Sequence, residues 1–174
     1  MPQTPGSPPV WLLGSSVPSA IMAGRNGLPY SYAHFIHPDN TRAAIEAYRA
    51  VFTGPGQPRV ILGVGVYCAE TEERARRIYA SHQLVRHRLS LGVLAPVASP
   101  QEAHDELREA GFTETEPEWP RCVVGTPEQV RDKLTAMATA LGVDELIAMS
   151  FIHDHKDRMY SFELLAQALE VPPR

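Results

Sequence analysis

The sequence has few cysteines. Cys68 and Cys122 are the only two among 174 residues, and they stand far apart without CxxC spacing. Disulfide frameworks and zinc knuckles need more thiols at closer spacing, so the sequence supports neither. The default compartment for such a chain is a reducing one, and we expect a cytoplasmic protein.

The sequence also lacks a long apolar run and a basic patch. No stretch approaches the roughly 20 apolar residues of a membrane-spanning helix. Residues 1–10 (MPQTPGSPPV) contain no basic segment followed by an apolar one, which a secretory leader would need. The net charge is -4, with lysines and arginines interspersed among acids. We therefore expect neither nucleic acid nor a membrane as a partner.

The sequence contains enough hydrophobic residues to form one core. Hydrophobic residues make up 44% of the chain, which is typical of an ordinary globular protein. Residues 1–9 are mostly Pro, Gly, Ser and Thr, a composition that predicts a flexible Pro-rich arm. Residues 10–174 are expected to form a single domain.

Buried-strand patterns alternate with helical patterns along this domain. Strands are expected at 10–13, 29–36, 59–67 and 144–152, the first of them buried on both faces. Helices are expected after each strand, and capping signatures at 99–102 and 126–129 open two more, the first of these in an inserted helix and loop over 92–122. About four consecutive parallel βα units are the result, an α/β fold. A closed barrel needs eight strands, so this is part of a (β/α)8 TIM-type barrel.

Five segments, in this order and spacing, resemble a known family. They are VWLLGSS, NGLPYSYAHFIHP, VYCAETEERARRIY, VVGTPEQVRDKL and GVDELIAMSFIHDH. Together they are similar to the C-terminal half of the luciferase-like monooxygenases, from Val10 to Leu169. The resemblance implies a half barrel and a flavin-dependent oxidoreductase that acts on a small organic substrate with oxygen. Its cofactor would be FMN, or coenzyme F420 as in some branches of the family.

The bend after the first strand is the main candidate site. Gly14 permits close backbone approach, while Ser15, Ser16 and Ser19 bring hydroxyls and free N–H groups to a helix N-terminus, where anions bind. The family resemblance implies that this bend binds the flavin phosphate. The alternative is that the serines only cap the helix.

Two histidines close the second strand. His34 and His37 lie at the strand end where the active sites of barrels gather. His34 is the candidate catalytic residue, because an imidazole can handle a proton near neutral pH. The alternative is a hydrogen-bonded structural histidine.

The HDH sequence at residues 153–155 resembles a fragment of a metal site. Zinc sites use three or four ligands, and no further ligand stands at a fixed spacing from these residues. We interpret the segment as a solvated turn in which Asp154 or Asp157 caps a helix, and we expect no metal.

Two other functions stay open at this point. The chain could be a non-catalytic flavin-binding or oligomerisation module, or a fragment of a longer reading frame, because the family has four more βα units upstream. A half barrel exposes strand edges and an apolar face, so we also expect a homo-oligomer.

Overall fold

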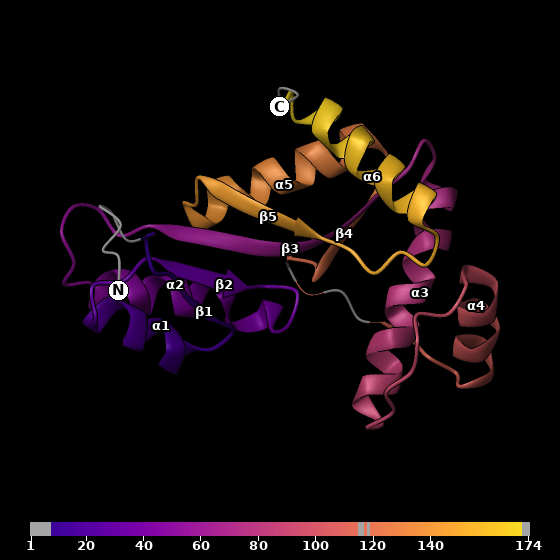
Figure 1. Ribbon diagram of the computed structural model, residues 1–174, viewed down its shortest axis with the longest axis horizontal. Coiled ribbons are helices and arrows are strands. Elements are labelled where there is room, and N and C mark those ends of the chain that lie inside the picture. The colour runs from indigo at the N-terminus through magenta and orange to yellow at the C-terminus, as the bar shows by residue number, and fades with distance from the viewer. Residues whose placement is uncertain (1–7, 115–116, 118, 172–174) are drawn as a thin grey trace, which may run out of the picture. The chain divides into compact units, whose positions relative to one another are not determined.

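The computed structural model describes residues 8–114, 117 and 119–171 (Figure 1). The strands are β1 (Leu12–Gly14), β2 (Tyr30–Ala33), β3 (Val60–Cys68), β4 (Cys122–Gly125) and β5 (Glu145–Met149). The helices are α1 (Val17–Arg25), α2 (Thr41–Ala50), α3 (Glu72–Ser90), α4 (Pro100–Glu109), α5 (Pro127–Leu141) and α6 (His155–Ala168), with a 3-10 turn, η1, at Pro38–Asn40. Most of the expected Pro-rich arm, residues 1–7, lies outside the described residues.

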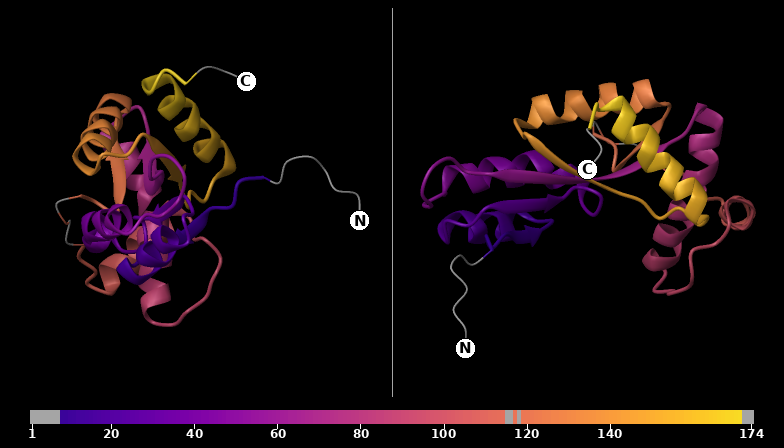
Figure 2. Two further views of the ribbon diagram at one scale, coloured as in Figure 1. Left: turned by 90° about the vertical axis from the view of Figure 1, so that its left-hand side faces the viewer. Right: turned by 45° about the horizontal axis from the view of Figure 1, so that its top comes forward.

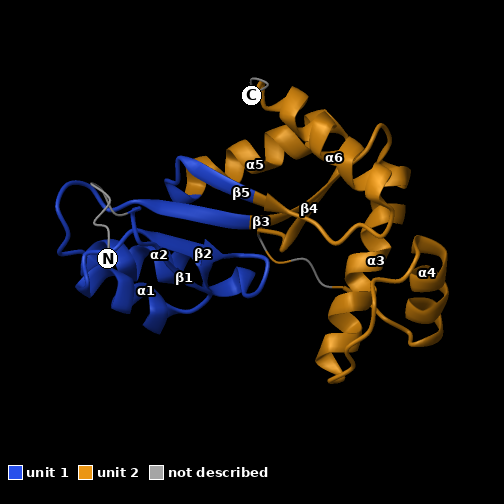
Figure 3. Cartoon of the chain, in the orientation of Figure 1, with its two compact units in different colours: residues 1–63, 141–147 blue, residues 64–140, 148–174 orange. Residues whose placement is uncertain are grey.

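The chain divides into two compact units (Figure 3). The first comprises residues 1–63 and 141–147, and the second comprises residues 64–140 and 148–174. Strand β3 contributes its first residues to one unit and its last residues to the other. The single domain expected over residues 10–174 stays a prediction.

The first unit is built on parallel strands. β1 pairs with β2, and β2 pairs with the beginning of β3, so that Leu12, Tyr30 and Val60 stand in register. Helices α1 and α2 pack against each other beside these strands (Figures 1 and 2). Tyr30 and Tyr48 are fully buried, with ring centroids 5.6 Å apart, and they join β2 to α2. Aromatic residues therefore supply much of this core.

The second unit is built around the end of β3. Its last residues pair in parallel with β4, from Gly65 opposite Cys122 to Cys68 opposite Gly125. One apolar cluster packs α3 on these strands, and a second joins α3 to α4. Helices α3 and α4 are labelled in Figure 1. Added to Gly65, a Cβ atom would lie 2.3 Å from Cys122 Sγ, so the strands can approach this closely only at a glycine.

Side-chain caps mark the starts of several helices, and the capping signature expected at residues 99–102 forms as predicted. Thr71 caps α3, and Ser99 forms a capping box with Glu102 at the start of α4. Asp154 caps α6 by accepting hydrogen bonds from two backbone N–H groups, as the interpretation of the HDH segment expected. Gly142 follows α5 with a φ of 62°, a conformation that glycine adopts without strain. Local side-chain chemistry thus explains where these helices begin and end.

Two expectations from the sequence are wrong. The first strand is not buried on both faces, because Leu13 is 69% exposed. Alternate side chains of a strand point to opposite faces, and no described part of the chain covers the face that carries Leu13. The second error is the omission of β4, which begins at Cys122, the last residue of the region expected to be an inserted helix and loop, and ends at Gly125. A strand of four residues is too short to show a recognisable periodic pattern of hydrophobic residues.

Both cysteines are buried and unbridged. Within the described ranges, no helix combines the length and the apolar character that a membrane crossing requires.

Candidate functional site

The four residues predicted to form the cofactor-binding bend lie together at the carboxyl end of β1. Gly14 ends the strand, Ser15 follows it, and Ser16 is the N-cap of α1. The Ser16 hydroxyl accepts a hydrogen bond from Ser19 N–H, and the Ser19 hydroxyl accepts one from Ser16 N–H, each at 3.3 Å. Ser16 and Ser19 therefore form a capping box, the arrangement that the sequence left as an alternative.

The glycine of this turn is required by the serine of the helix. On Gly14 a Cβ would lie 2.2 Å from Ser19 Oγ and 2.6 Å from Ser19 Cβ. Rotation of the hydroxyl could relieve the first contact but not the second. Close packing of the strand end against the first turn of α1 therefore explains the glycine, whereas its predicted role in the approach of a phosphate stays a prediction.

Two tyrosines of β2 form hydrogen bonds with the β1–α1 turn, and the sequence analysis did not identify them. Tyr30 Oη lies 2.9 Å from Ser19 Oγ, and Tyr32 Oη donates to the carbonyls of Ser15 (3.3 Å) and His37 (2.7 Å). Burial raises the pKa of both phenols, so they stay protonated and can donate. Their spacing, two residues apart on one strand, was the only signal in the sequence that they share a face.

The turn keeps donors that the protein does not use. The Ser15 hydroxyl makes no hydrogen bond with any described residue, and Val17, the first residue of α1, has a backbone N–H without an intrahelical acceptor. The first turn of α1 contains no acidic residue. A hydroxyl and an N–H at a helix N-terminus suit a phosphate, because the helix dipole favours negative charge there.

His34 lies just beyond β2 and is completely buried. Its Nδ1 is 2.7 Å from the hydroxyl of Thr41, the first residue of α2. The hydrogen bond matches the structural alternative stated for this residue. A proton-handling role for His34 stays a prediction.

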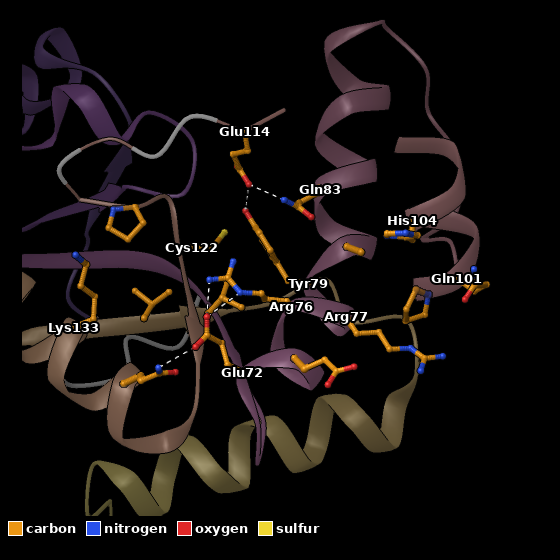
Figure 4. A pocket seen from close by; sticks show the side chains of 17 residues that line it. Glu72, Arg76, Arg77, Tyr79, Gln83, Gln101, His104, Glu114, Cys122 and Lys133 are labelled. Atoms are coloured by element: carbon orange, nitrogen blue, oxygen red, sulfur yellow. Dashed lines mark hydrogen bonds and ion pairs between the residues drawn. The ribbon is translucent and has the colours of Figure 1, made fainter. Parts of the chain in front are cut away.

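The second unit contains an open cavity of about 870 Å³ (Figure 4). Helices α3, α4 and α5 and strand β4 contribute its lining, and none of the predicted site residues is part of it. Its rim is charged and exposed, with Arg76 paired to Glu72 at 2.7 Å. Arg74, Arg76 and Arg77 of α3 are all exposed.

The inner wall of this cavity carries a half-buried carboxylate. Glu114 accepts hydrogen bonds from Tyr79 Oη and Gln83 Nε2, each at 2.9 Å, and it pairs with Arg86 (Figure 4). Burial raises the pKa of Glu114, but its donors and the charge of Arg86 more than offset this, so the pKa lies below its ordinary value. The carboxylate is therefore ionised and fully partnered, a structural arrangement.

Comparison with known proteins gives one consistent family. Residues 1–145 match the family model described as luciferase-like monooxygenase. An uncharacterized Bacillus subtilis protein, YvbT, is 35% identical over 91% of this chain and 48% of its own length. The crystal structure of apo-MsnO8 is 47% identical, with a TM-score of 0.89 over 99% of this chain and 54% of that one.

A more distant structure shares the fold. The oxygenating constituent of 3,6-diketocamphane monooxygenase from Pseudomonas putida, solved in complex with FMN, is 18% identical, with a TM-score of 0.60 over 97% of this chain and 50% of that one. The chain thus spans about half the length of the curated relatives it matches. The predicted fold class, a partial (β/α)8 barrel of parallel βα units, is confirmed, with one more strand than expected.

Proposed function

Since the chain belongs to the luciferase-like monooxygenase family, we propose that it takes part in flavin-dependent oxygenation of a small organic substrate, with the β1–α1 turn binding the flavin phosphate. The observation that supports the proposal is the set of unused donors on Ser15 and Val17 at the N-terminus of α1. When bound, the reduced flavin would supply the electrons that activate oxygen.

The residues of the turn would bind and orient the cofactor. Ser15 Oγ and Val17 N–H would donate to phosphate oxygens, and the helix dipole would add to the attraction. Tyr30 and Tyr32 would keep the turn in place through their hydrogen bonds to the residues at the start of α1. Gly14 would let the strand end and the helix approach closely enough for these donors to converge.

FMN is the proposed cofactor, and F420 is the alternative. FMN ends in a phosphate monoester, which carries more negative charge than the phosphodiester of F420 and suits a turn with several free donors. Riboflavin has the same ring system without the phosphate. Comparing the affinities for FMN, F420 and riboflavin therefore tests the phosphate contact directly, and equal affinity for FMN and riboflavin would remove the assignment.

The Ser15→Ala variant tests the individual hydroxyl. We expect about a fivefold loss of FMN affinity, the value of one hydrogen bond of about 1 kcal/mol, with riboflavin affinity and thermal stability unchanged. Fluorescence titration measures both affinities. Ser90→Ala, at an exposed serine of α3, is the matched control. Ser19→Ala should weaken FMN binding too, but it also removes a capping contact and should lower the melting temperature.

Self-association is the second part of the proposal. Val10, Leu13, Ile36 and Ile147, all in the first unit, are between 44% and 69% exposed. Val10 and Leu13 lie at β1, Ile36 follows β2 and Ile147 is in β5. Large exposed apolar side chains favour burial against another protein surface. We propose that a second copy of the chain covers them.

Sedimentation velocity tests this association. We expect an oligomer for the parent chain and a shift to monomer for Leu13→Lys, because the charge would be buried without a partner. The matched control is Leu94→Lys, at a side chain 86% exposed in the second unit, which should leave the oligomer intact. A monomeric parent chain would contradict the proposal.

Flavin binding without turnover is a second candidate function. The unused donors of the β1–α1 turn support it equally, because they would bind a phosphate whether or not oxygenation follows. Purified protein that binds FMN but consumes no oxygen with reduced FMN and an aldehyde would support it. Protein that binds no flavin would contradict both candidates.

A further inference from the structure

A buried tyrosine and a buried histidine meet in the second unit. Tyr67 of β3 is fully buried and His82 of α3 is 2% exposed, and Tyr67 Oη is hydrogen-bonded to His82 Nδ1. The same phenol oxygen accepts a hydrogen bond of 2.9 Å from the backbone N–H of Phe151. One hydroxyl thus links β3, α3 and the segment between β5 and α6.

The hydrogen bonds allow the protons to be assigned. Phe151 N–H donates to the phenol oxygen, and among the described residues His82 Nδ1 is the neighbour that can accept the proton of this buried phenol, so we assign Tyr67 as the donor and an unprotonated Nδ1 as the acceptor. The proton of the neutral imidazole is on Nε2, which lies 4.0 Å from Cys122 Sγ. His82 is therefore held in one tautomer and accepts from Tyr67.

Phe151 stands at the carboxyl end of β5. Its ring packs edge-on against His82, with centroids 5.3 Å apart, yet 42% of the residue is exposed. Ile152 beside it is buried, and Asp154 caps the helix that follows. Ligand-binding sites in parallel α/β folds lie at this end of the strands. The position of Phe151 would therefore affect a ligand bound there.

Charged and titratable groups face His82 from three elements. Burial is the main cause that lowers its pKa to about 4, and the positive charges of Arg86 on α3 and Arg121 before β4 act in the same direction. Glu114 opposes them. Tyr67, Tyr79 and Cys122 also surround the imidazole, and burial raises the pKa of each, so they are neutral.

We propose that Tyr67 and His82 are positioning residues that hold the β5–α6 segment at Phe151, through a hydrogen-bond chain that exists only while His82 is neutral. A proton on Nδ1 would remove the acceptor that Tyr67 uses and would place a charge in an apolar cluster. The segment is then released at acid pH. This inference concerns the second unit alone and stands whether or not the first unit binds flavin.

Hydrogen exchange of the Phe151 amide tests the proposal. A released segment exposes His82, whose pKa then returns toward 6.5, so release binds a proton and becomes more favourable as pH falls from 6.5 toward 4. We expect the protection factor of the Phe151 amide to fall at least about tenfold between pH 7 and pH 5. The reference is the Ala69 amide, which donates to the Gly125 carbonyl in the same unit and reports global opening.

Variants distinguish an effect of the Tyr67–His82 hydrogen bond from a general loss of stability in acid. His82→Gln should keep Phe151 protection constant over this pH range, because glutamine does not titrate. Tyr67→Phe should lose protection at every pH. His104→Gln, at an exposed histidine of α4, should behave like the parent chain.

Two outcomes would overturn the proposal. One is parent protection of Phe151 that follows Ala69 at every pH, and the other is an unchanged pH profile in His82→Gln. If Tyr67→Phe does not fold, the parent profile and His82→Gln still decide the question.

Discussion

Replacing Gly14 with alanine is expected to lower FMN affinity at least about twentyfold and to destabilise the first unit by about 2 kcal/mol. The added Cβ would overlap Ser19 Cβ, which lies 2.6 Å from its position, and it would also press on the phenol of Tyr30 at 3.1 Å. The strand end and the first turn of α1 must then separate. Because the Ser15 hydroxyl and the helix N–H groups move together, the loss exceeds that of any single donor.

Fluorescence titration with FMN and unfolding in urea measure the two effects of Gly14→Ala. The matched control is Gly63→Ala in the same unit, where the nearest atom to an added Cβ is Phe35 Cε1 at 3.3 Å and a small shift suffices. Gly14→Ala with the FMN affinity of the parent chain would exclude the turn as the phosphate site.

Replacing Glu114 with glutamine is expected to destabilise the second unit by about 2 to 3 kcal/mol. The variant keeps the shape of the side chain but leaves the Arg86 guanidinium without an opposite charge. Its amide replaces one carboxylate oxygen by an NH2 group, which faces a donor in either orientation, either Arg86 or Tyr79 and Gln83. The side chains of Glu114 and Arg86 are 20% and 29% exposed, so solvent screens the pair only in part.

The contribution of Glu114 should depend on pH in a defined direction. Its pKa is lower in the folded chain than its ordinary value of 4.5, so the unfolded state binds the proton more tightly. The stabilisation is present above that ordinary value and is lost as pH falls through the lower, folded value. Parent and Glu114→Gln should therefore differ most near neutral pH and converge in acid.

Urea unfolding at several pH values measures this difference. The control is Glu72→Gln, which breaks an exposed pair with Arg76 on the rim of the same cavity and should change stability little. If the two variants lose the same free energy of unfolding, the half-buried position of Glu114 does not make its ion pair more stabilising than the exposed one.

Much of the local structure followed from short stretches of sequence. Thr71, Ser99 with Glu102, and Gly142 mark helix ends because a cap requires only residues a few positions apart. The serine turn was recognisable for the same reason, since Gly14 and Ser19 are near neighbours in the chain. Family resemblance added the half barrel and the cofactor class.

The partners of the candidate site were decided by tertiary structure. Tyr30 and Tyr32 reach the turn only because β2 pairs in register with β1, and the sequence carried no separate signal for that register. The partners of His34 could not be foreseen either, since its bond to Thr41 depends on how the chain turns through η1 into α2.

By itself the sequence determined the helix caps, the order of the helices and the position of the serine turn. Only the tertiary structure decided the exposure of Leu13, the pairing of β4 beside Gly65, and the chain from His82 through Tyr67 to Phe151. The reason is physical: caps arise from contacts within one turn of chain, whereas burial and buried hydrogen bonds depend on which distant segments pack together.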